Sequence, residues 1–172
     1  MGNQNFIKPV AAFIFFILGQ AVFGQQMVLG SYAFCFFYVG YLLGLPFELG
    51  RVPLLFIGFA LGISVDIVYN TIGIHAASCV LMAYAREPVK GWFRPGGGYE
   101  PGMEPTIQSM GFQWVFSYSA SLIAIHHILF FLLEASDWTL ISSTLLKILA
   151  STAFTLAVIL IIKSLNIKRR RR

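Results

Sequence analysis

The sequence contains little charge, and this scarcity excludes an ordinary water-soluble domain. Only 11% of its 172 residues are charged, 58% are hydrophobic, and the mean hydropathy is +0.77. Soluble domains carry roughly 25% charged residues, so this chain has too few to cover a surface facing water. Because a membrane helix needs about 20 residues, the chain is long enough for several spans. It is too short for a second folded domain beside them.

Cysteine is scarce as well, and the motifs of common enzyme and cofactor sites are missing. Cys35 and Cys79 both lie in apolar runs, where we interpret them as buried thiols outside any disulfide framework. The glycine-rich stretch at 95–102 lacks the strand, helix and Lys-Ser/Thr of a phosphate-binding loop. We find no nucleophile–base pair, metal-ligand quartet or folded basic face. The sequence therefore predicts no enzyme activity, metal, cofactor or nucleic-acid binding.

Six apolar runs predict an all-α, polytopic transmembrane bundle that forms one integral membrane domain over residues 1–172. Short breaks of glycine, proline, glutamine and charge separate these runs. The second and fourth are short for a bilayer, which favours tilted neighbours or a thinned membrane. The expected spans cover about 9–23, 31–45, 54–69, 74–85, 112–133 and 140–162, with a polar loop at 86–111 and a basic tail at 163–172.

The basic residues predict that both termini are cytoplasmic, because lysine and arginine stay on that side of a membrane. With six spans, eleven of the twelve fall inside, namely Lys8, Arg51, Arg86, Lys90, Arg94, Lys163, Lys168 and Arg169 to Arg172. Only Lys147 falls in the outer half. Five spans are the alternative. Residues 86–94 could form an amphipathic stretch at the inner interface or an unstructured connector.

Asp66 is the first candidate for a functional side chain, because a carboxylate within a membrane helix is costly unless it is paired or wetted. Gly58, Gly62 and Asp66 are spaced by four, so they share one helix face onto which another helix can pack closely. Asp66 would then form a buried polar or proton-sensitive site, or it would reach interfacial water at the helix end. The same spacing at Gly40 and Gly44 predicts tight packing of the second span against the third.

His75 begins the fourth span, nine positions after Asp66 and just beyond the turn at Gly73. Across so short a turn the two side chains could form a carboxylate–imidazole pair, which relieves the cost of burying either one alone. The alternative is a polar helix start at the interface. Gly58, Gly62, Asp66, Gly73 and His75 are therefore the candidates for helix packing or partner contact.

Two further polar features lie inside the last two spans. His126 and His127 point about 100° apart on a helix, so they cannot bind one ion from one face. We expect them to form interhelical hydrogen bonds instead. Lys147 is expected to extend toward the outer interface, the alternative being an ion pair with Glu134, Asp137 or Asp66.

These features resemble the rod shape-determining protein MreD family, in particular versions from the Bacteroidetes. The resemblance lies in the run at 58–69, in Thr71 to Ala77, in Met82-Ala83-Tyr84, and in the combined glycine, Asp66 and Gly-x-His-Ala pattern. The loop at 97–102, His126-His127, the length, the span count and the basic tail also fit, whereas the first two spans are only generically similar.

The resemblance implies a non-catalytic scaffold in the cell-elongation machinery of the bacterial cytoplasmic membrane. Such proteins associate with a bitopic MreC partner and, through it, with the MreB filament and peptidoglycan synthases. Membrane lipid and a second copy of the chain are the other partners considered.

Two alternatives belong to different functional classes. The first is a substrate-binding subunit of a small-molecule transporter, whose helical architecture is similar. It would need an outward cavity, to which Asp66, His75 and Trp138 could contribute. The second is an intramembrane enzyme, which the spread of polar residues over several depths disfavours.

Overall fold

The computed structural model describes residues 4–24, 26–100, 102–135 and 141–165, and it is mostly helical. Within these ranges, three helices are long and apolar enough to cross a membrane, namely α3, α6 and α7, and residues 7–23 form a shorter apolar helix. A small antiparallel hairpin is the only sheet in these ranges. The elements are α1 (Gln4–Phe23), β1 (Val28–Leu29), β2 (Ala33–Phe34), α2 (Val39–Gly44), α3 (Arg51–Tyr69), α4 (Ile74–Trp92), α5 (Ile107–Met110), α6 (Phe112–Glu134) and α7 (Ile141–Leu165).

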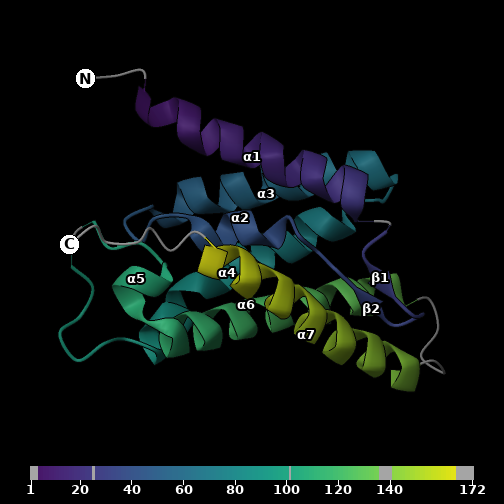
Figure 1. The fold of residues 1–172 in the computed structure, drawn as a ribbon. Helices are drawn as coiled ribbons and strands as arrows, with labels where there is room; N and C mark the ends of the chain where they lie inside the picture. The colour runs from purple at the N-terminus through teal and green to yellow at the C-terminus, as the bar shows by residue number, and fades with distance from the viewer. Residues whose placement is uncertain (1–3, 25, 101, 136–140, 166–172) are drawn as a thin grey trace.

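The chain passes back and forth between two ends of the bundle (Figure 1). At the left, the start of α1 lies near the end of α2, α5 and the end of α7, and a shared cavity lined by Pro9, Pro46, Pro105 and Lys163 joins these segments. At the right, the end of α1 lies near the hairpin and the end of α6. We call the first the basic end, after Arg86, Lys90 and Lys163, and the second the Asp66 end.

The predicted helix over 31–45 is wrong. Residues 32–38 run through a turn, the β2 strand and an irregular connection that ends in a second turn, and within 31–45 only α2 is helical. The chain is fully buried where the two segments join, since Tyr38 and Val39 are 0% exposed, and Leu43 of α2 is also 0% exposed. Non-helical backbone at membrane depth is tolerated where protein surrounds it. This segment therefore crosses the bundle interior without forming a regular membrane helix.

The predicted end of the fourth span at residue 85 is also too early. Helix α4 continues to Trp92, and Arg86 and Lys90 are buried on it. Residues 86–92 are therefore helical, while glycine- and proline-rich turns follow, as the composition predicts.

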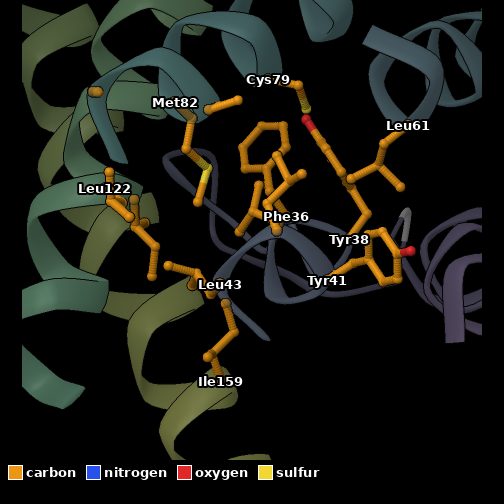
Figure 2. Packing of buried hydrophobic residues seen from close by; sticks show 14 of the residues in the cluster. Phe36, Tyr38, Tyr41, Leu43, Leu61, Cys79, Met82, Leu122 and Ile159 are labelled. Carbon is orange, nitrogen blue, oxygen red and sulfur yellow. The ribbon is translucent and has the colours of Figure 1, made fainter. Parts of the chain in front are cut away.

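The hydrophobic core surrounds the non-helical segment. Phe36 and Tyr38 come from that segment and Leu43 from α2, and side chains of the surrounding helices pack on them (Figure 2). Figure 2 shows the Tyr38 ring extending toward Cys79, so that its hydroxyl end lies deep between helices. The core therefore places the hydroxyl group of Tyr38, from residues 32–38, against α4 and α6.

Candidate functional site

Asp66 closes the turn between α3 and α4. Its Oδ1 accepts hydrogen bonds from the Thr71 hydroxyl at 2.5 Å and from the His75 amide at 3.1 Å, and its Oδ2 accepts from the Ala76 amide at 2.9 Å. The first amides of a helix have no partner within the helix, so the carboxylate satisfies them and complements the positive end of the helix dipole. The buried Asp66 thus holds the start of α4 from the end of α3.

The two glycines before Asp66 allow the backbones of α3 and α4 to approach. A Cβ built on Gly62 would lie 2.6 Å from the backbone nitrogen of Ala76, and one built on Gly58 would lie 3.1 Å from the Cys79 carbonyl oxygen. Gly73 adopts φ +74° at the start of α4, a left-handed conformation that favours glycine. The five predicted packing candidates therefore all lie at this one helix pair.

His75 does not pair with Asp66 through its ring, so the predicted carboxylate–imidazole pair is wrong. Asp66 instead accepts from the His75 backbone, and the His75 ring turns toward Tyr38. The Tyr38 hydroxyl lies 2.8 Å from His75 Nδ1 and 2.8 Å from His126 Nε2. One hydroxyl has a single proton to donate, so it donates to one ring and accepts from the other. Tyr38 thus links α4 to α6 in the interior.

Hydrogen bonds from α1 and α7 hold the backbone of residues 32–38. Gln20 donates to the Cys35 carbonyl at 3.3 Å, and Ser151 accepts from the Phe34 amide at 3.0 Å. Thr155 accepts from the Phe36 amide at 3.1 Å, and its hydroxyl also lies 3.3 Å from His127 Nε2. Backbone groups that lack water need such internal partners. His127 thereby links α6 to α7, in line with the predicted interhelical role of the two histidines.

Thr155→Val should destabilise the protein by about 2 kcal/mol, because it leaves the buried Phe36 amide without an acceptor. Denaturant unfolding of the full chain in detergent measures the change. Thr155→Ser keeps the hydroxyl and is the matched control, expected to unfold near the wild type. Equal midpoints for the valine and serine variants would contradict the role of this hydrogen bond.

A cavity of about 350 Å³ opens at the Asp66 end. Aromatic side chains of β2, α6 and α3 form much of its wall, and Gln20, Thr71, His75 and Glu134 add polar groups. The His75 side that faces Tyr38 is hydrogen-bonded, whereas its Nε2 has no hydrogen-bond partner among the described residues. The cavity thus combines apolar walls with a few convergent polar groups, as small-molecule sites do.

Three cations converge on the carbonyl groups at the end of α2, a feature that the sequence reasoning missed. Arg86 donates to the Leu45 carbonyl, to the Pro46 carbonyl at 3.2 Å and to the Tyr118 hydroxyl at 2.8 Å. Lys90 donates to the Phe47 carbonyl at 3.3 Å, and Lys163 to the Leu43 carbonyl at 3.4 Å. The last carbonyls of a helix lack internal partners, and cations there complement its dipole.

The loop beyond α4 packs onto this cation cluster. The Tyr99 ring lies 5.7 Å from Lys90 Nζ, and its hydroxyl donates to the Lys90 carbonyl at 2.9 Å. Burial raises the pKa of Tyr99 above its ordinary value, since desolvation disfavours the phenolate. The hydroxyl therefore stays protonated and keeps this contact at neutral pH.

Two other sequence-based expectations have different outcomes. Lys147 forms an ion pair with Glu134 at 3.3 Å, which is the alternative to extension into the interface.

Gly40 packs against Phe16 of α1 and Ile159 of α7, so its predicted packing against α3 is wrong. Asp137, Trp138, Lys168 and Arg169 to Arg172 lie outside the described residues, and no role for them is assigned.

The described residues contain no group of three or more His, Cys, Asp or Glu side chains arranged to hold a metal ion. Comparisons with known protein families, with curated proteins and with solved structures find no match for this chain.

Proposed function

We propose that this chain is a six-pass, non-catalytic membrane scaffold of the MreD type, which supports cell elongation together with MreC-like and MreB-like partners and peptidoglycan synthases. In this proposal both termini and the basic end face the cytoplasm, in the bacterial inner membrane. The alternating course of the chain and the gathering of cations at one end support that orientation. The proposed partners are those that the sequence resemblance to the MreD family implies.

The use of the motif residues supports a scaffold. Asp66 binds two backbone amides, and Gly62 admits the backbone of α4. Gly73 forms the turn between the helices. These residues fix the geometry of the α3–α4 pair, which is what a docking platform requires. Rigid presentation of a surface lowers the ordering cost of binding.

The observation that carries the proposal is the outer face of this same helix pair. It forms an apolar groove of about 610 Å³ whose floor contains the small residues Gly73, Ala76 and Ala77. Its walls are Leu55, Phe59, Ile63, Val80, Leu81 and Tyr84. Membrane helices associate through small residues that admit close backbone approach. We assign this groove to the single membrane helix of the bitopic partner.

Ala77→Trp should fill the groove and lower recovery of the partner on the order of tenfold, which corresponds to about 1.4 kcal/mol. The test is purification from native membranes in mild detergent with quantitative mass spectrometry. Wild type should retain a bitopic coiled-coil protein and peptidoglycan synthases in stable proportion. Ala153→Trp, at an exposed alanine of α7, is the matched control and should retain them equally. Equal recovery with both tryptophan variants would place the partner elsewhere.

A second candidate function is the substrate-binding subunit of a small-molecule transporter. The cavity at the Asp66 end favours it, because aromatic walls and the polar side chains of Gln20, Thr71 and His75 suit a small polar ligand. The same purification discriminates between the two. A chain that carries a small organic molecule, or that copurifies with a pair of ATPases, would overturn the scaffold proposal.

A further inference from the structure

The basic end contains a cleft of about 320 Å³ between α1 and α7. Helix α1 packs on α2 and α3, whereas α7 packs on α6 and β2, so α2 lies between the two walls (Figure 1). Phe16 and Ala12 line the cleft from α1, and Ile162 and Lys163 line it from α7. The cleft therefore joins the apolar interior of the bundle to its polar end.

The depth of the cleft depends on Gly44, which has no side chain to fill it. Gly44 belongs to its floor, and a Cβ built there meets no atom within 4 Å. Gly40, one helical turn earlier, is covered by Phe16, so the open space lies toward the basic end. A side chain at residue 44 would therefore extend into the cleft, and its Cβ would not clash with the surrounding protein.

The polar end of the cleft is cationic. Lys163 donates to the Pro105 carbonyl at 2.7 Å and approaches Leu43 at 3.4 Å, and an ammonium group has a third donor. Glu87 pairs with Lys90 at 2.8 Å, but within the described part of the chain no acid pairs with Lys163 or Arg86. Among the described residues that line this mainly apolar cleft, Lys163 is the charged one and none is an acid.

We propose that this cleft binds one phospholipid with an anionic headgroup, with an acyl chain over Gly44 and Phe16 and the phosphate at Lys163. The apolar floor of the cleft suits a hydrocarbon chain. A free anion would bind only at Lys163 and would leave this apolar floor uncovered. Lys163 lies at one end of the bundle, at the level where the headgroup of a bound lipid would sit. Basic residues at that level attract anionic lipid. The proposal requires only that the chain spans a membrane, so it does not depend on the proposed scaffold function.

The experiment measures lipid retained by the full chain after detergent extraction from liposomes that contain equal amounts of phosphatidylglycerol and phosphatidylcholine with identical acyl chains. Native mass spectrometry counts the bound lipids. Wild type should retain phosphatidylglycerol in preference to phosphatidylcholine, on the order of fivefold, the effect of one basic contact. Lys163→Gln should lower this preference by the part that Lys163 contributes, because glutamine can still donate to the Pro105 carbonyl but carries no charge.

Gly44→Leu should remove the single retained lipid while leaving all charges in place. Gly91→Leu is the matched control, since residue 91 is also an exposed helical glycine with no atom within 4 Å of a Cβ. Every variant keeps the basic residues 168–172, so their attraction for lipid cancels in the comparison. Equal retention by Gly44→Leu and Gly91→Leu, both folded, would overturn the proposal. If Gly44→Leu fails to fold, an unchanged preference in Lys163→Gln overturns it instead.

Free phosphate distinguishes a lipid from a simple anion. Excess inorganic phosphate should not displace the retained phosphatidylglycerol, because the acyl chain contributes to binding. Complete displacement by phosphate would mean that only an anion is held at Lys163, and it would contradict the lipid site.

Discussion

Asp66→Ala is expected to lower the free energy of unfolding by about 3 kcal/mol, one of the two largest effects that we predict. Three hydrogen bonds end on this carboxylate, and two of the donors are backbone amides at the buried start of α4. Alanine leaves these amides without an acceptor, and each buried unsatisfied donor costs about 1–3 kcal/mol. Denaturant unfolding of the purified chain in detergent measures the loss.

Two further variants separate this role from a general effect of mutating α3. Asp66→Asn keeps one acceptor oxygen and should lose less stability than Asp66→Ala. Ser64→Ala removes an exposed hydroxyl on the same helix that donates to the Ala60 carbonyl of its own preceding turn, so it should stay close to wild type. In Asp66→Ala, hydrogen exchange should increase first at the amides of His75 and Ala76. Unfolding of Asp66→Ala at the same denaturant concentration as Ser64→Ala would contradict this role.

The helix-packing face of α3 could be predicted because its cause is local in sequence. Gly58, Gly62 and Asp66 recur every four residues, and that spacing places them on one side of a helix whatever surrounds it. The pattern did not reveal what the carboxylate binds. The side-chain pair with His75 was the wrong expectation because it omitted the backbone amides, which any helix beginning beside Asp66 presents.

The non-helical course of residues 32–38 could not be predicted from the run itself. Its apolar composition is equally compatible with a helix or a buried extended segment. The choice depends on Gln20, Ser151 and Thr155, which satisfy its backbone from two distant helices. Ser151 and Thr155 are a helical turn apart on α7, a signal that one helix face carries hydroxyl groups. The sequence does not indicate that this face of α7 binds the backbone of residues 32–38.

The buried cations were missed for a similar reason. Arg86 and Lys90 lower the hydropathy of α4, and a charged residue usually marks the end of a span. Their partners are carbonyl groups about 40 residues earlier in the chain, at the end of α2. The charges are therefore accommodated inside the bundle, where ionisable residues of membrane helices usually face.

Gly62→Ala is expected to have an effect of similar size, a loss of about 3 kcal/mol, although it adds a single methyl group. The added Cβ would lie 2.6 Å from the nitrogen of Ala76 and from the carbonyl oxygen of His75. Both are backbone atoms, so no side chain can rotate away and the two helices must separate. Overpacking of a core usually costs about 1–3 kcal/mol. Denaturant unfolding in detergent measures the change.

Two other glycine-to-alanine variants calibrate this prediction. Gly58→Ala meets Ala83 Cβ at 3.2 Å and should cost less, and Ala83→Gly in the same chain should restore part of the loss. Gly91→Ala meets nothing and should be neutral or stabilising, since alanine favours a helix by up to about 1 kcal/mol over glycine. Equal stability of Gly62→Ala and Gly91→Ala would show that α3 and α4 are not in close backbone contact.

The losses caused by Gly62→Ala and Asp66→Ala should also be less than additive. Separation of the helices at Gly62 moves the Ala76 amide away from Asp66, so the first substitution already weakens the bonds that the second removes. Substitutions in contact typically couple by about 0.5–3 kcal/mol. A double-mutant cycle measures this coupling. Strict additivity would mean that the glycine contact and the carboxylate cap act independently, and that the α3–α4 turn is not a single structural unit.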